Sequence, residues 1–291
     1  MDVDRTADDA DSTLAAVEEV LGVKVTDLPA HAEDAGRARL VRTEDRLHLT
    51  VEALDPEGDD ATNLVRREID LIAGPNLVVS IHEGETAALA RFRKGLDGET
   101  RLGLLTAGDL LSTLVDEVLD GYFLIAEKIE REIDELDQQA LRGARRDHVL
   151  ERIVRLRHRI GVVRRTLAPH RQALSTLALP EMRAAELVGQ PWPGLIDRLE
   201  SAMDTIEGLR DGLIGTFDIH MSRESQRAND VMRTLTLLSA VLLPAVVLAG
   251  IMGMNFKLGF FDDTTNFWLV IVTMVSLAVG ILAVAHSRGW L

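Results

Sequence analysis

The 291-residue sequence contains no cysteine. Disulfide bonds and thiolate metal sites are therefore excluded, and the composition fits a reducing compartment. The chain also lacks a P-loop and a glycine-rich phosphate motif, which together with the missing cysteine nucleophile makes an enzyme the least favoured class. Its eight histidines show no paired ligand spacing, so we interpret them as structural or exposed residues rather than as zinc ligands.

Basic residues are outnumbered by acidic ones. Lys and Arg total 32 against 47 Asp and Glu, which gives a formal net charge of −15. The charges of residues 234–291 cancel, so the whole excess belongs to residues 1–233. Nucleic acid is not an expected partner, because its binding needs clusters of Lys and Arg. The acidity favours cations instead, although solubility alone is the simpler explanation.

Two long runs near the end of the sequence contain no charged residue. They cover residues 234–256 and 264–287, which are 23 and 24 residues long. About 20 mostly apolar residues span the hydrocarbon core of a bilayer, so both runs predict transmembrane helices. The loop at residues 257–263 is too short to hold a domain. The two helices are therefore expected to form a hairpin, with both chain ends on the same side of the membrane.

The charges that flank this hairpin predict its orientation. Arg223, Arg227 and Arg233 precede the first run and Arg288 follows the second, whereas the loop carries Lys257 against two aspartates. The positive-inside rule places both termini in the cytoplasm, as in a multi-pass protein of the cytoplasmic (inner) membrane. The acidic start of the sequence lacks the apolar segment of a signal peptide, so we expect no cleaved leader.

The first part of the sequence predicts a compact α/β domain. Residues 46–54 alternate in the manner of a strand, and residues 77–82 form a β-branched run that a charged turn closes. Residues 11–21 have helical spacing behind a capping residue. Strands interleaved with short helices are therefore expected up to about residue 105.

Long helices are expected after this domain. From Asp109 onward, apolar residues recur every three or four positions, and a second long helix is predicted at about residues 146–177, with Pro169 as a kink. After Pro193, no proline occurs up to residue 243, which predicts a continuous helix on the order of 75 Å long that enters the bilayer.

One stripe along this third helix changes character toward the membrane. Its members recur every three or four residues: Asp218, Ser222, Ser225, Asn229, Met232, Leu235 or Thr236, Ser239 and Leu243. The first four are polar, and the rest mix apolar and small hydroxyl residues. Such a stripe is typical of a pore lining or of an ordinary packing seam between helices, and the pattern alone does not decide between them.

Several segments resemble the CorA family of divalent-cation channels. Residues 229–244 and 249–256, which include Gly253-Met254-Asn255, are similar to the first transmembrane helix and signature of that family. The resemblance covers most of the chain, weakly before residue 105 and strongly after about residue 215. It also includes these upstream segments: residues 122–134, 164–171 and 218–222. The tripeptide is a specific sign of this family because of its place in the sequence. It stands at the end of the first of two C-terminal spans, and a long predicted helix leads into that span.

The resemblance implies a fold and an assembly. It implies a homopentamer with a funnel-shaped α+β cytoplasmic domain, five long stalk helices that continue as the pore-lining first span, and second spans packed outside. The expected parts are a cytoplasmic α/β domain at 1–105, long helices at 106–193, the stalk and first span at 194–256, an outer loop at 257–263, the second span at 264–287 and a cytoplasmic tail at 288–291.

The resemblance also implies roles for individual residues. Gly253, Met254 and Asn255 would form the outer selectivity ring. The residues expected to line the pore and its gate are Asp218, at the cytoplasmic end, and Asn229, Met232, Leu235 and Leu243. These positions coincide with the stripe, which favours the pore over the packing seam.

The implied function is transport of Mg²⁺, with Co²⁺ or Ni²⁺ as further cargo. Mg²⁺ gives up its water reluctantly, so five neutral Asn255 carboxamides suit its hydration shell, whereas carboxylates could hold the ion too tightly. Met232, Leu235 and Leu243 would gate the pore by dewetting. The channel would close when cytoplasmic Mg²⁺ binds.

Regulatory carboxylates are expected between neighbouring subunits, where a bound metal would reverse their repulsion. The position aligned with the family's stalk carboxylate is Gly194, and Asp197 lies one turn along. Asp55, Asp59 and Asp60 are possible partners, although solvated surface acids are the simpler reading of each of these residues.

The sequence departs from the family pattern in three places. One is the C-terminal end, residues 286–291, which is less basic than is common in the family. Met252 stands where tyrosine is usual, and the loop at residues 257–263 lacks the familiar Met-Pro-Glu-Leu stretch. Two alternatives stay open at this point. One is a Zn²⁺ transporter of the same superfamily, and the other is a membrane-anchored assembly or sensor protein without a conducting pore.

Overall fold

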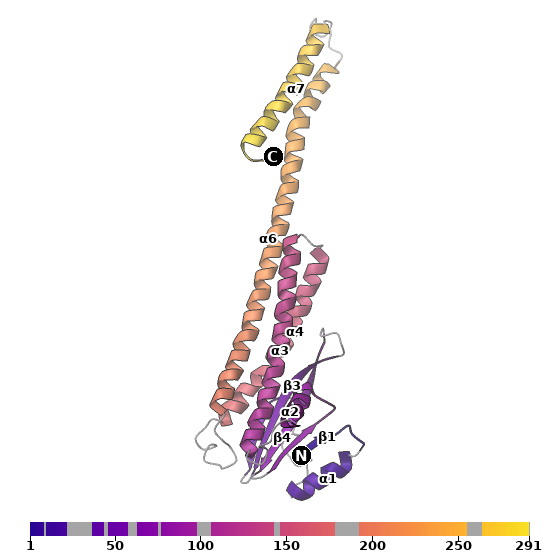
Figure 1. Cartoon of the computed structure of the whole chain (residues 1–291). Coiled ribbons are helices and arrows are strands. Elements are labelled where there is room, and N and C mark those ends of the chain that lie inside the picture. Colours follow the sequence, from indigo (N-terminus) through magenta and orange to yellow (C-terminus); the bar gives the residue numbers. More distant parts are fainter. Residues whose placement is uncertain are drawn as a thin grey trace. The chain divides into compact units, whose positions relative to one another are not determined.

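The computed structural model describes most of the chain in two compact units (Figure 1). The units are Met1–Phe217 and Asp218–Leu291, and helix α6 (Trp192–Met252) contributes to both. The described residues are 1–8, 10–21, 37–43, 46–57, 63–74, 77–97, 106–142, 146–177, 192–254 and 264–290.

A five-stranded sheet forms one part of the first unit. Its strands are β1 (Asp2–Asp4), β2 (Arg39–Thr43), β3 (Arg46–Pro56), β4 (Leu64–Gly74) and β5 (Leu77–His82). They lie in the order β1-β5-β4-β3-β2, with β1 parallel to β5 and every other pairing antiparallel. The strands predicted at residues 46–54 and 77–82 are confirmed as β3 and β5, whereas β1, β2 and β4 were not predicted.

Alternate residues of the central strands point to opposite faces of the sheet. On β3, Leu47, Leu49 and Val51 are buried in the larger apolar core. The core continues on these helices: α2 (Ala87–Asp97), α3 (Ala107–Arg142), α4 (Arg146–Leu177) and the first part of α6. A smaller core on the other face joins Val79 and Ile81 of β5 to α1 (Ala10–Leu21).

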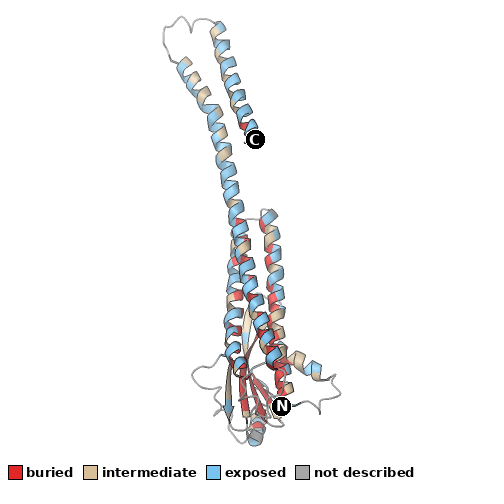
Figure 2. Ribbon diagram, turned by 90° about the vertical axis from the view of Figure 1, so that its left-hand side faces the viewer, coloured by how far each residue is buried: buried red, intermediate tan, exposed pale blue. Residues whose placement is uncertain are grey.

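The long helices follow the predicted spacing closely. On α3, Val118, Tyr122 and Ile129 are each at most 1% exposed, and they lie on the face that the 3.6-residue period predicts. Helix α4 has the predicted bounds and continues through Pro169. Figure 2 shows these buried faces in red on the inner sides of the helices and sheet.

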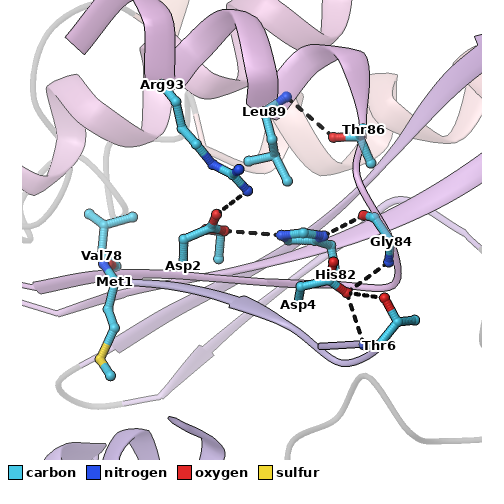
Figure 3. A network of polar contacts seen from close by, with 11 residues as sticks. Met1, Asp2, Asp4, Thr6, Val78, His82, Gly84, Thr86, Leu89 and Arg93 are labelled. Atoms are coloured by element: carbon cyan, nitrogen blue, oxygen red, sulfur yellow. Dashed lines mark hydrogen bonds and ion pairs between the residues drawn. The ribbon is translucent and has the colours of Figure 1, made fainter. Parts of the chain in front are cut away.

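A polar network fixes the short edge strand β1 against β5 (Figure 3). The Asp2 carboxylate accepts hydrogen bonds from Ser80 at 2.5 Å and from the His82 ring at 3.2 Å, and it also pairs with Arg93. Although partial burial opposes it, these partners lower the pKa of Asp2 to about 2. Burial alone would lower the pKa of His82, but the hydrogen bonds to Asp2 and to the Gly84 carbonyl, with the charges of Asp2 and Asp4, raise it. Strand β1 is therefore anchored by charge as well as by its backbone.

A second buried network joins β3 to the two long helices. The Tyr122 hydroxyl donates to the Glu52 carbonyl at 2.8 Å, and the Glu52 N–H donates to His170 Nε2 at 3.1 Å. Burial lowers the pKa of His170 to about 4, so its ring is neutral. Both side chains belong to segments that resemble the channel family. Their role in this chain is structural, because they satisfy the β3 backbone inside the core.

The second unit is an antiparallel hairpin of α6 and α7 (Thr264–Ser287), and α7 runs back along the last part of α6 (Figure 1). Both helices are long and apolar enough to cross a membrane, and the residues of their most apolar windows are not buried within the chain. This exposure distinguishes them from the core helices of a soluble fold. The two predicted spans are therefore present as helices.

Candidate ion pathway

One face of α6 in the second unit packs toward α7. Its partly buried residues recur every three or four positions, and they are Arg233, Leu237, Val241, Pro244, Ala245, Leu248 and Met252. The corresponding residues of α7 are Asn266, Val270, Ile271, Met274, Ala278, Ile281 and Ala285. The two sets form the seam of the hairpin.

The predicted pore stripe lies on a different face. Met232, Leu235 and Leu243 are 62%, 56% and 64% exposed, and Asn229 and Ser239 are exposed as well. At 3.6 residues per turn, the mean direction of this stripe is about 160° from that of the seam. The stripe therefore lies opposite the side that α7 covers. Large apolar side chains left bare in this way need lipid or another protein chain against them.

Helix α6 ends just before the predicted selectivity residues. The Gly253 N–H donates to the Ala249 carbonyl at 2.9 Å, and the Met254 N–H donates to the Ile251 carbonyl at 3.2 Å. A Cβ on Gly253 would meet the Ala249 carbonyl at an ordinary 3.4 Å, so the fold of a single chain does not require glycine there. Asn255 lies outside the described residues, and its role in the ring stays a prediction.

The two helices of the hairpin are also joined at their other ends. The Arg233 guanidinium donates to the Gly289 carbonyl and lies 5.7 Å from the centre of the Trp290 ring. Gly289 has a φ of 68° and closes α7 with a hydrogen bond from its N–H to the His286 carbonyl at 3.0 Å. The sequence did not reveal this contact, although arginine and tryptophan are typical membrane-interface residues.

The predicted regulatory carboxylates have different environments. Asp197 is exposed on α6. Asp55 accepts a hydrogen bond from the Ala87 N–H at 3.2 Å, so it caps helix α2, and burial raises its pKa. Asp59 and Asp60 lie outside the described residues. In the described part of the chain, no group of three or more His, Asp or Glu side chains is arranged to hold a metal ion.

The position aligned with the stalk carboxylate has acidic neighbours that the sequence did not indicate. Gly194 lines a pocket of about 350 Å³ together with Asp116 and Arg198. The Arg198 guanidinium lies 3.1 Å from Asp116, and it also pairs with Asp120. Burial raises the pKa of Asp116 despite this cation. One arginine of the same chain therefore balances part of the charge of this acidic pair.

Comparisons with known proteins agree with this architecture. The family model of CorA-like Mg²⁺ transporter proteins matches residues 3–286. The cobalt/magnesium transport protein CorA of Thermotoga maritima is 30% identical over 206 residues, which are 69% of this chain and 56% of that protein. The chain thus spans little more than half the length of that relative.

A second relative matches over nearly the whole chain. The cobalt/magnesium transport protein CorA of Methanocaldococcus jannaschii is 25% identical over 290 residues, 98% of this chain and 89% of that protein. The complete structure of the magnesium transporter CorA from this organism matches with a TM-score of 0.81 at 24% identity. That match covers 100% of this chain and 90% of the other. The fold, with both candidate spans, is therefore shared.

Proposed function

The chain belongs to the CorA-like Mg²⁺ transporter family, and we propose that it carries divalent cations across the cytoplasmic membrane through the centre of a homopentamer. Mg²⁺ is the proposed main cargo, and Co²⁺ and Ni²⁺ are further candidates. The names of the two relatives support divalent cation transport in general.

The observation that carries the proposal is the bare stripe of α6. Because α7 covers the opposite side of the hairpin, five copies can turn this stripe inward while the second spans pack outside. Asn229 would offer a polar ring near the cytoplasmic side, with Asp218 below it. Met232, Leu235 and Leu243 would form apolar constrictions that stop conduction by dewetting.

The outer mouth is assigned to Gly253, Met254 and Asn255. Helix α6 ends at Met252, so Asn255 follows three residues after the last helical residue. Five neutral carboxamide oxygens would hold the hydration shell of Mg²⁺ without trapping the ion. Gly250 and Gly253 have room for a side chain within one chain, which is consistent with a need for close approach by neighbouring helices instead.

Both termini are placed in the cytoplasm. The arginines before α6 enters its apolar part support this orientation through the positive-inside rule. The contact of Arg233 with Gly289 and Trp290 joins the two helix ends that would share this interface.

Closure is proposed to follow binding of cytoplasmic Mg²⁺ between subunits. The net charge of −15 lies outside the hairpin, so neighbouring subunits would repel each other without a cation. Asp197, Asp55, Asp59 and Asp60 are the proposed regulatory carboxylates. If neutral replacements at these four positions leave the protection from proteolysis by Mg²⁺ unchanged, the sensor lies elsewhere.

A flux assay on proteoliposomes tests the function. Wild-type protein should admit Mg²⁺, and Asn255→Ala should reduce uptake to the level of empty liposomes while the pentamer still forms by native mass spectrometry. Thr273→Ala is the matched control, because Thr273 is an exposed polar residue of α7 whose hydroxyl donates to the Leu269 carbonyl of the same helix at 2.8 Å.

The other outcomes identify the alternatives. Uptake of Zn²⁺ in preference to Mg²⁺ would indicate a zinc transporter of the same superfamily. A pentamer that admits none of Mg²⁺, Co²⁺, Ni²⁺ and Zn²⁺ would indicate an assembly or sensor protein. Normal Mg²⁺ uptake by Asn255→Ala would contradict the assigned selectivity ring.

A further inference from the structure

A basic pocket lies in the first unit, where α4 passes the β2 edge of the sheet. Its volume is about 810 Å³, which is within the size range of small-molecule sites. Four arginines line it, and they are Arg37, Arg39, Arg66 and Arg165. Thr166 and Gln172 of α4 add polar groups to the wall. This concentration of positive charge is unexpected in a chain with a net charge of −15.

The four guanidinium groups have little countercharge. Among the described residues, the carboxylate nearest to them in an ion pair is Glu52, whose Oε1 lies 3.8 Å from Arg66. Arg37, Arg39 and Arg165 pair with no described carboxylate, whereas other arginines of the same unit do. Examples of such pairs are Arg91 with Glu117, Arg159 with Glu132 and Arg171 with Glu200. The pocket thus gathers cations without neutralising them.

One of these arginines has an unsatisfied donor. A terminal nitrogen of Arg39 is shielded from solvent and has no hydrogen-bond partner. A buried guanidinium donor without an acceptor costs free energy, and like charges gathered in one pocket add to that cost. An anion in the pocket would relieve both effects.

The carboxyl group of Glu52, which pairs with Arg66, is only partly ionised near neutral pH. Burial raises the pKa of Glu52 to about 7, against the effect of the neighbouring Arg66, and Glu68 acts in the same direction as burial. The nearby His170 ring is neutral, as described above. A bound anion would favour protonated Glu52, so the contribution of Glu52 should favour anion binding more as the pH falls through this range.

We propose that this pocket binds a polyphosphate anion, with the four guanidinium groups as its ligands. Arginine presents a rigid fork of donors that matches the oxygens of a phosphate group, and such charge-assisted bonds are stronger than neutral ones. Four such forks match several linked phosphates better than one. The site is independent of the ion pathway, because its residues lie on β2, β4, α4 and the segment before β2.

The binding test uses the full-length protein in lipid nanodiscs, in buffer with EDTA so that Mg²⁺ complexes do not contribute. Isothermal titration calorimetry with tripolyphosphate, ATP and inorganic phosphate should show binding of the two polyphosphates and weaker binding of phosphate. Equal affinity for tripolyphosphate and ATP would mean that the pocket recognises the phosphates alone. Tighter binding of ATP would mean that the pocket also recognises the nucleoside. Both results support the site.

The variant Arg39→Gln/Arg165→Gln should weaken polyphosphate binding about tenfold or more, because two charge-assisted contacts are lost. Arg157→Gln is the matched control, since Arg157 is exposed on the same helix but does not line the pocket. Circular dichroism checks folding, and Arg66→Gln, at an exposed position, replaces the double variant if that one fails to fold. Because the phosphate groups also take up protons between pH 8 and pH 6, the wild type is compared with Glu52→Gln at each pH. The affinity of the wild type relative to that variant should rise as the pH falls from 8 to 6.

Three results would overturn the proposal. One is the absence of polyphosphate binding by the wild type, and another is an equal loss of binding in Arg157→Gln. The third is dissociation of the pentamer by the pocket variants without any added anion, which would make a neighbouring subunit the occupant. None of these results depends on ion flux, so a failed transport function and a failed pocket are distinguishable.

Discussion

The two parts of helix α6 differ in how they use the same apolar periodicity. In the first unit, Leu199, Ile206 and Leu213 are 0%, 2% and 4% exposed because they pack into the core of their own chain. In the second unit, Met232, Leu235 and Leu243 recur with similar spacing and are more than half exposed. The periodicity therefore identifies the face of the helix that makes contacts. In the first unit this face packs into the core of the same chain, and in the second unit it is left for lipid or another chain.

The largest expected effect is on the free energy of unfolding of the first unit, which should depend on the first part of α6 and not on the second part. Leu199→Ala leaves a cavity in the core and should cost about 2–5 kcal/mol, whereas Leu238→Ala should leave the first unit unchanged. Leu238 is 55% exposed and belongs to neither the stripe nor the seam. Urea denaturation followed by the fluorescence of Trp192, which is buried in the same core, measures the difference. Equal loss in both variants would remove the distinction between the parts.

The next effect concerns the exposed face itself. Leu243→Ser would hydrate an apolar ring and should raise Mg²⁺ leak through the closed channel about tenfold, which corresponds to about 1.4 kcal/mol of barrier. Leu238→Ser is the control outside the stripe and should not leak. A leak of similar size in both variants would mean that the stripe does not line the pathway.

A smaller effect is expected at the edge of the sheet. Asp2→Asn removes the partner of His82 and Arg93 and should destabilise the attachment of β1 by on the order of 1 kcal/mol, after discounting for its partial exposure. The stabilisation due to Asp2 is present above its unfolded pKa of 3.8 and is lost as the pH falls toward 2. The contribution of His82, whose pKa is raised, is present below 6.5 and is lost as the pH rises through the raised value.

Hydrogen exchange of the β1 and β5 amides across this pH range tests both signs. Protection should be greatest between about pH 4 and 6, and its pH dependence should become smaller in Asp2→Asn, where the Gly84 carbonyl and Asp4 still act on His82. Protection that keeps rising above the pKa of His82 would contradict the assigned ion pair.

The smallest effect is expected at the second unit's helix ends. Arg233→Gln loses the cation–π contact with Trp290 and weakens the bond to the Gly289 carbonyl, which should cost about 0.5–1 kcal/mol. Limited proteolysis should then cut the C-terminal residues faster, whereas Arg227→Gln should leave the rate unchanged. Arg227 pairs with Glu224 on its own helix. Equal rates in the wild type and Arg233→Gln would mean that this contact does not hold the chain end.

Local patterns predicted α1, the long helices and two strands, but missed α2, β1, β2 and β4. Helix α4 and the second span have the predicted bounds, because a long 3.6-residue period or a charge-free run is visible without knowing any neighbour. The first half of β4 carries Arg66, Arg67 and Glu68, which hide any alternation. Its strand is stabilised by pairing with β3 and β5, and such pairing is not encoded locally.

The sequence predicted which residues form the stripe on α6, but it did not predict which groups lie around the candidate site residues. The stripe from Asn229 to Leu243 followed from helical spacing. That α7 covers the opposite side of α6, and that Asp55 caps α2, required the structure. The basic pocket is a stronger example, because Arg37 and Arg165 are 128 positions apart and only the fold brings them to one pocket.

The sequence by itself determined the two spans, the long helices and the face of α6 that bears the stripe, because length, charge and a 3.6-residue period are properties of neighbouring residues. Only the tertiary structure decided which apolar faces are buried, which of the described arginines are paired, and where the described carboxylates find their partners. The physical reason is that burial and charge pairing depend on residues far apart in the chain, and folding alone brings them together.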